Sequence, residues 1–183
     1  MANKKSIPVT LLYGGVAALG MILFTIGTYK AGTQTFISSI VFLMYLIPVV
    51  LAIVGVLVEK KRQQGYIEFR AALRICFGVI VLALAVQVIF AWVLLHLIDP
   101  AFGRSLPPAV LVKTEAAYRR FGMSEDEISR NIADLKDTDP FSFGAMAIGL
   151  ARNCILGFLI ALVPAALIRR KRPEPAGSPV KNE

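Results

Sequence analysis

Four long apolar stretches dominate the pattern of hydrophobic and polar positions along the chain. Residues 6–29 and 31–58 contain no charged side chain, and residues 75–98 contain only one ionisable group, His96. Residues 140–168 are interrupted by a single charge, Arg152. A helix needs about 20 apolar residues to cross the ~30 Å hydrocarbon core of a bilayer. The pattern therefore predicts four transmembrane helices, listed here by residue number: about 8–29, 36–58, 73–98 and 145–168.

The longest polar stretch lies between the third and fourth spans and carries the signals of two short helices. A Pro-Pro pair at 107–108 suits the first turn of a helix, and Gly122 suits the position just after a helix ends. Ser124 and Glu127 have the spacing of a capping box, which marks the start of a second helix. We therefore expect a helical hairpin over residues 107–136, either a lid or brace on the bundle or a module that binds a partner.

These elements predict an all-α integral membrane protein with an extracytoplasmic hairpin between its third and fourth transmembrane helices. The four-helix transmembrane domain, with its hairpin, is expected to cover residues 1–172. Residues 173–183 contain three prolines and no apolar period, so we expect them to form a disordered cytoplasmic tail.

The composition agrees with a membrane protein and argues against other classes. The chain has 183 residues, of which 56% are hydrophobic and 17% are charged, and its net charge is +8. Soluble domains carry about 25% charged residues. Disorder requires low hydrophobicity, and a soluble nucleic-acid binder would have to share its basic surface with too many apolar residues. We therefore expect no nucleic-acid partner.

The distribution of charge predicts the orientation. The side with both termini carries twelve of the basic residues and four of the acidic ones, whereas the hairpin side carries seven basic and eight acidic residues. Short loops rich in Lys and Arg stay in the cytoplasm. Both termini are therefore expected to be cytoplasmic. We interpret the basic runs at 60–62 and 169–172 as topology signals, with attraction of anionic lipid headgroups as the alternative.

Small residues recur every four positions along the fourth span and predict where it packs. The set is Gly149, Asn153, Gly157, Ala161 and Ala165. Such a stripe lets another helix backbone approach closely, which is how helices associate in lipid.

Several polar residues are predicted to lie in the outer half of the membrane. Ionisable residues within a span are candidate functional sites by default, and Arg152 is the clearest case. Counting inward from the outer edge places Asn153, Gln87, Tyr45 and His96 in the outer half of the membrane as well. Together they could bind an anionic group such as a lipid phosphate. The alternative is that Arg152 extends to the headgroups and the amides only hydrogen-bond between helices.

Signatures of catalysis and of metal or cofactor binding are lacking in the sequence. One histidine and two cysteines at different depths, Cys76 and Cys154, do not make a metal site. No phosphate-binding glycine loop and no hydrolase motif occurs. We therefore expect no enzyme activity and no cofactor.

Several short motifs, in order, resemble a known family. They are Gly-Tyr-Ile-Glu-Phe at 65–69, Asp-Pro-Ala-Phe at 99–102, Gly-Met-Ser-Glu-Asp-Glu-Ile at 122–128 and Pro-Phe at 140–141. Over about residues 6–172 the chain resembles the bacterial membrane-protein family called domain of unknown function 4199. The resemblance implies a helical protein of the cytoplasmic membrane of Gram-negative bacteria. It implies no activity and no catalytic residues.

Two functions therefore stay open at this level. The favoured one is a non-catalytic accessory or scaffold protein of the inner membrane, acting through helix–helix contacts and its hairpin with a membrane-protein partner or a second copy of itself. The alternative is a component that binds or transports a lipid or small ligand through the polar cluster around Arg152.

Overall fold

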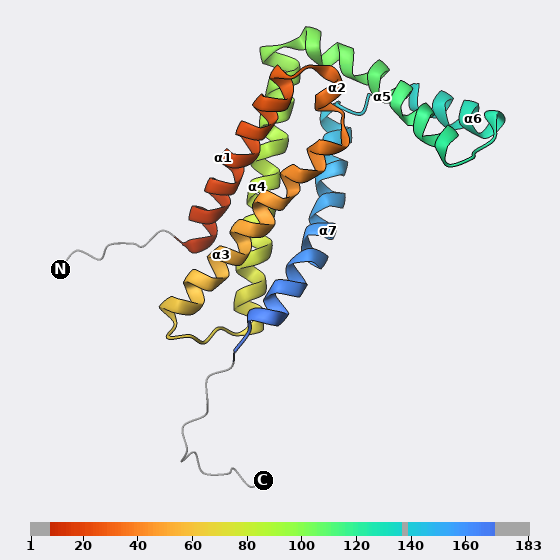
Figure 1. Cartoon of the computed structure of the whole chain (residues 1–183). Coiled ribbons are helices and arrows are strands. Elements are labelled where there is room, and N and C mark those ends of the chain that lie inside the picture. Colours follow the sequence, from red (N-terminus) through yellow and green to blue (C-terminus); the bar gives the residue numbers. More distant parts are fainter. Residues whose placement is uncertain (1–7, 137–138, 171–183) are drawn as a thin grey trace, which may run out of the picture.

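The computed structural model describes residues 8–136 and 139–170, and its regular structure is helical apart from one isolated bridge (Figure 1). Four helices are long and apolar enough to span a membrane, which confirms the predicted all-α membrane fold. Their bounds are Val9–Lys30, Ser39–Arg62, Phe69–Ile98 and Phe143–Ile168. The tail predicted at residues 173–183 lies outside the described residues.

The second and third spans each change helix type along their length. The second begins as a 3-10 helix, η1 (Ser39–Tyr45), and continues as α3 (Leu46–Arg62). Pro48 has no N–H to donate to the carbonyl of the residue four positions earlier, which interrupts α-helical bonding where the two types meet. The third span is α4 (Phe69–Val93), which ends in a π-helical turn, η2 (Leu94–Ile98).

The central helix of the bundle is α4. Helices α1 (Val9–Lys30), α3 and α7 (Phe143–Ile168) all pack against it, whereas α1 and α7 make no contact with each other. The buried residues of α4 are Ala72, Cys76, Val79, Ile80, Ala83, Leu84 and Gln87. The core of the protein is therefore the surface of α4 and what packs onto it.

Small residues let the neighbouring helices approach α4 closely. A Cβ added at Gly14 of α1 would lie 2.6 Å from Cδ2 of Leu82, and one added at Gly157 of α7 would lie 2.8 Å from Cγ2 of Ile80. Lipid tails are as apolar as Leu, so close packing rather than the hydrophobic effect holds such helices together.

Only part of the small-residue stripe on α7 lies against the bundle. Gly157, Ala161 and Ala165 are buried, and Asn153 is half-buried. A Cβ added at Gly149 would meet open space. The stripe therefore brings α7 onto α4 in the half of the span near Ile168 and leaves room beside α7 in the other half.

The hairpin between the third and fourth spans begins earlier than the sequence predicts. Its first helix, α5, runs over Pro100–Arg120 with Pro107 and Pro108 inside it, and its second, α6, runs over Glu125–Lys136. The reason lies at Asp99, whose carboxylate accepts a hydrogen bond from the backbone N–H of Phe102 at 2.9 Å. Pro100 follows in the first turn, the position that proline prefers. Because the helix is already capped at Asp99, Pro107 and Pro108 lie inside it instead of marking its first turn.

The turn inside the hairpin has the geometry that its sequence predicts. Gly122 has φ +76°, in the left-handed region that glycine adopts after a helix. Ser124 donates its backbone N–H to the Glu127 carboxylate at 3.0 Å, and Glu127 donates its backbone N–H to Oγ of Ser124 at 3.4 Å. The backbone N–H and then the hydroxyl of Ser124 lower the pKa of Glu127 from its ordinary value.

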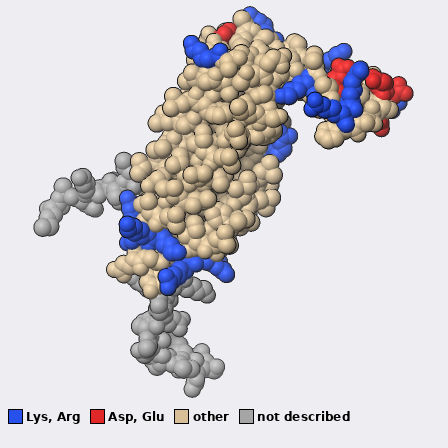
Figure 2. All heavy atoms as spheres, in the orientation of Figure 1, with Lys and Arg blue, Asp and Glu red and all other residues tan. Residues whose placement is uncertain are grey.

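The hairpin extends past the edge of the bundle (Figure 1). Helix α5 crosses one end of the bundle and continues beyond it, and α6 folds back on α5 and contacts no other described element. Lys113 donates Nζ to the carbonyl of Ile37 at 2.6 Å, which ties α5 to the segment after α2 (Thr33–Phe36). We call this end of the bundle the hairpin end. We call the opposite end the basic end, because Lys and Arg gather there in Figure 2.

Replacing Gly157 with Leu should lower the free energy of unfolding by about 1–3 kcal/mol, the usual cost of overpacking. The added side chain would collide with the stiff branched side chain of Ile80. Gly149→Leu is the matched control, because the same change on the same helix meets open space. Thermal unfolding in detergent measures both variants. Equal loss of stability in the two would show that the contact of Gly157 with α4 is not what holds α7.

Candidate functional site

A groove opens on the side of the bundle, beside α7 and toward the hairpin end. Its volume is about 310 Å³, and η1, α3, α4 and α7 form its walls. Its lining residues are Phe42, Tyr45, Pro48, Val49, Ile80, Leu84, Arg152, Asn153, Leu156, Gly157 and Ile160. Phe42, Leu156 and Ile160 are exposed, so the groove opens onto the surface that contacts lipid. We call it the lateral groove.

Three residues of the predicted polar cluster meet in the lateral groove. Asn153 donates Nδ2 to the hydroxyl of Tyr45 at 3.3 Å, which links α7 to the end of η1. Arg152 lines the same groove and is exposed. No carboxylate among the described residues lies within ion-pair distance of its guanidinium.

Arg152 lies below the edge of the apolar region rather than at it. Residues 153–168 rise about 24 Å along the helix at ~1.5 Å each, which is short of the ~30 Å hydrocarbon core. The span must therefore include Arg152 and the turn before it. From this depth of roughly 6 Å a long arginine side chain can extend to the headgroup level.

The other two predicted cluster residues lie elsewhere. Gln87 is buried and donates Nε2 to Oγ1 of Thr25 on α1 at 2.6 Å, and its Oε1 has no hydrogen-bond partner among the described residues. His96 lies in η2, 3.1 Å from the carbonyl of Trp92, and its ring stacks on that of Trp92 with 5.0 Å between centroids. His96 lines a separate cavity of about 330 Å³ at the hairpin end, together with Arg104.

Counting residues from the membrane edge gives the depth of a side chain but not the neighbour that it faces. Gln87 and Arg152 are both predicted to lie in the outer half of the membrane, yet Gln87 bonds to α1 and Arg152 lies beside η1. The apolar walls of the groove were also missed, because lipid-facing and groove-lining side chains look alike in sequence. The one usable signal was Gly157, whose small size brings α7 and α4 together at the groove's edge.

The base of the hairpin is held by a second polar contact that the sequence did not reveal. The hydroxyl of Tyr29 on α1 donates to the Asp99 carboxylate at 2.9 Å. The N–H of Phe102 and then the Tyr29 hydroxyl lower the pKa of Asp99, with smaller help from the nearby charge of Arg104. The ring of Phe102 packs edge-on against that of Tyr29, with centroids 4.9 Å apart. Tyr29 thus anchors α5 to α1.

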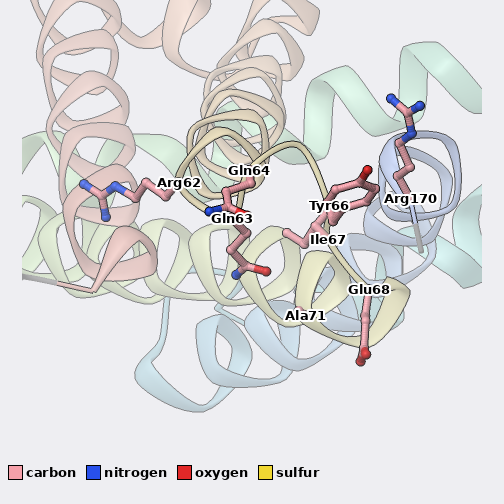
Figure 3. Close-up of a pocket in the computed structure, with 8 residues that line it drawn as sticks. All are labelled: Arg62, Gln63, Gln64, Tyr66, Ile67, Glu68, Ala71 and Arg170. Atoms are coloured by element: carbon pink, nitrogen blue, oxygen red, sulfur yellow. The ribbon is translucent and has the colours of Figure 1, made fainter. Parts of the chain in front are cut away.

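A third cavity, of about 490 Å³, lies at the basic end (Figure 3). It is formed by the loop between α3 and α4 and by Arg170, which follows α7. Among the described residues, no group of three His, Cys, Asp or Glu side chains could hold a metal ion.

Replacing Asp99 with Ala should loosen the first turn of α5 and make it insensitive to pH. A carboxylate whose folded pKa lies below its ordinary value stabilises the fold above that ordinary value, here 3.8, and loses the effect as the pH falls through the folded pKa. Hydrogen exchange of the amides of residues 102–104, corrected for its intrinsic pH dependence, should be constant in the parent above pH ~4 and faster below. Asp99→Ala should exchange faster than the parent above pH ~4 and should lack the change at low pH, and Tyr29→Phe should lie between. Equal protection in Asp99→Ala and the parent would contradict the anchor.

The comparisons with known proteins agree with the resemblance seen in the motifs. The family model described as "Protein of unknown function (DUF4199)" matches residues 11–170. No curated protein and no solved structure matches the chain. Since the match covers most of the first span, the other three spans and the hairpin, the chain belongs to the DUF4199 family.

Proposed function

We propose that this protein is a non-catalytic membrane protein that binds an anionic phospholipid in the lateral groove. The observation that carries the proposal is the meeting of Arg152, Asn153 and Tyr45 in an apolar groove that opens toward lipid. In this arrangement Arg152 contacts the lipid phosphate and the apolar walls contact part of an acyl chain. The partners proposed are therefore membrane lipids.

The unpaired charge of Arg152 supports the choice of an anion. A charged side chain within the hydrocarbon region is costly and is normally paired. The described residues offer Arg152 no carboxylate, and we propose that the membrane supplies the counter-charge. A phosphate is the natural partner, because the guanidinium fork donates two parallel hydrogen bonds to it.

The apolar walls support a lipid rather than a small soluble anion. Apart from Arg152, Asn153 and Tyr45, the residues that line the groove are apolar. The groove opens between helices on the side of the bundle, rather than at an end that would face water. Its volume is at the lower end of the 300–1,000 Å³ typical of ligand pockets. None of the lining residues is a His, Cys, Asp or Glu. We therefore propose that the groove binds a ligand without catalysing a reaction and without a cofactor.

We further propose that the protein lies in the bacterial inner membrane with both termini in the cytoplasm. At the basic end the described residues include seven basic side chains but only two acidic ones, Glu59 and Glu68 (Figure 2). The positive-inside rule favours the cytoplasm for this end. The lateral groove would then lie in the outer leaflet.

A second candidate function is that of an accessory scaffold. It is favoured by the hairpin, because among the described elements α6 contacts α5 alone, and it projects beyond the bundle. A projecting helix of this kind can contact a neighbouring membrane protein or a second copy of the chain. Recovery of such a partner at fixed stoichiometry in mild detergent would support this role.

Replacing Arg152 with Gln should weaken binding of phosphatidylglycerol at the groove about tenfold, the effect of losing one charge-assisted hydrogen bond. Arg152→Lys should lose less, because it keeps the charge but not the fork. Leu156→Trp should also weaken binding by filling the groove. Native mass spectrometry of the protein released from phosphatidylglycerol nanodiscs measures the bound lipid.

Arg120→Gln is the matched control for Arg152→Gln, because it removes a charge at the hairpin end without touching the groove. It should leave lipid binding unchanged. A folded Arg152→Gln protein with the lipid profile of the parent would refute the groove as a lipid site.

Single cysteines should report the proposed orientation in intact cells. Ser129→Cys, exposed on α6, should react with an impermeant maleimide added outside. Lys61→Cys, exposed at the basic end, should react only after the membrane is opened. Both are made with the half-buried Cys154 replaced by Ser. The reverse pattern of labelling would overturn the orientation.

A further inference from the structure

We propose a second anion site, at the opposite end of the bundle from the lateral groove. The geometry points to the cavity at the basic end, where Arg62 and Arg170 would bind the phosphate of an anionic lipid headgroup or of a soluble phosphate monoester. We call this cavity the basic-end pocket. It is separate from the lateral groove, and it does not depend on the function proposed there.

The walls of the basic-end pocket are fixed by backbone bonds. Ile67 in the loop after α3 pairs with Arg170 after α7: the N–H of Ile67 donates to the Arg170 carbonyl at 3.1 Å, and the N–H of Arg170 donates to the Ile67 carbonyl at 2.9 Å. Ile67 is 1% exposed, which anchors the loop in the core. Gly65, with φ +90°, makes the turn that leads into it. Two segments far apart in sequence, around Ile67 and Arg170, are therefore joined to form the pocket. Basic residues that only fixed the orientation of the protein would not require this pairing.

The two arginines reach the pocket from different elements. The Arg170 guanidinium lies over the ring of Tyr66, 5.8 Å from its centroid. Arg62 comes from the end of α3, is about half exposed, and makes only a long 3.8 Å contact with Glu59. Figure 3 shows them on opposite sides of the loop, with the Arg62 guanidinium directed away from Tyr66 and Arg170. The Arg170 guanidinium is thus held in place, while Arg62 would leave its weak contact with Glu59 and turn toward the loop to bind the same ligand.

The charge around the pocket selects an anion. Glu68 is the only acidic residue in the lining, and its side chain points away from Tyr66 and Arg170 in Figure 3. Lys61, Arg70 and Arg169 add positive charge at the same end of the bundle. Arginine forks bind phosphate with two hydrogen bonds each, and basic pockets at the ends of transmembrane helices bind phospholipid headgroups in this way. Because the pocket is at the membrane–water boundary, a headgroup and a soluble phosphate can both reach it.

The test uses the full-length protein in nanodiscs and the double variant Arg62→Gln/Arg170→Gln. The probes are phosphatidylglycerol mixed into neutral lipid, and glycerol phosphate added to nanodiscs of neutral lipid alone. Arg152→Gln is present in every protein compared, so that the lateral groove does not mask the second site. Native mass spectrometry should then show a loss of at least tenfold in the binding of one or both probes. Loss for phosphatidylglycerol identifies a headgroup site, and loss for glycerol phosphate identifies a soluble-ligand site. The backbone pairing of Ile67 with Arg170 does not need the arginine side chain, so the variant should fold, and each single variant provides a second measure.

Arg169→Gln is the matched control, because Arg169 is exposed and adjacent to Arg170 but does not line the pocket. It should bind both probes like the parent. Equal binding of both probes by the parent and the double variant would overturn the proposal. So would equal losses in Arg169→Gln and the double variant, which would reduce the site to diffuse surface charge. Arg152→Gln should leave binding at this pocket intact, so failure here and failure of the lateral groove are distinguishable.

Discussion

The helices of this bundle cannot be held together by the hydrophobic effect, because a lipid tail is as apolar as the side chain that it would replace. What remains is dispersion between surfaces in close contact, which requires small residues where two backbones approach. Gly14 on α1 and Gly157 on α7 provide this space against Leu82 and Ile80 of α4. Since α1 and α7 do not contact each other, both are held by packing on α4, with α3 as a second neighbour of each.

The lateral groove follows from where that close contact stops. Toward the basic end from Gly157, Ala161 and Ala165 are fully buried against the bundle. Toward the hairpin end, a side chain at Gly149 would have open space, and Asn153 donates a hydrogen bond to Tyr45 instead of packing against a backbone. The helices therefore separate at the depth where Arg152 can extend to the headgroups. The packing pattern thus places an opening and an unpaired cation at one level of the membrane, which is the basis for inferring a lipid phosphate there.

Local sequence patterns predicted the elements of this fold well and their contacts poorly. The four spans follow from long runs without charge, and the turn at Gly122 and the Ser124–Glu127 box follow from short-range chemistry. The proline pair predicts a later start for α5 than the structure has, because the cap at Asp99 begins the helix at Pro100. Depth along a helix brought Arg152, Asn153 and Tyr45 together but could not show that Gln87 faces α1.

The basic side chains at the basic end are not all equivalent, because they make different contacts. A helix that ends at the membrane surface leaves carbonyls without partners, and cations near its C-terminus stabilise them. Lys60 serves α7 in this way, since its Nζ donates to the Ile168 carbonyl at 2.8 Å. The backbone of Arg170 is likewise bonded to Ile67, while its guanidinium stays at the pocket beside Tyr66. A run of basic residues that only fixed the orientation of the protein would do so with its charges at any position in the run. The assignment of Lys60 to a helix end, and of Arg62 and Arg170 to opposite walls of one cavity, indicates that position matters here as well as sign.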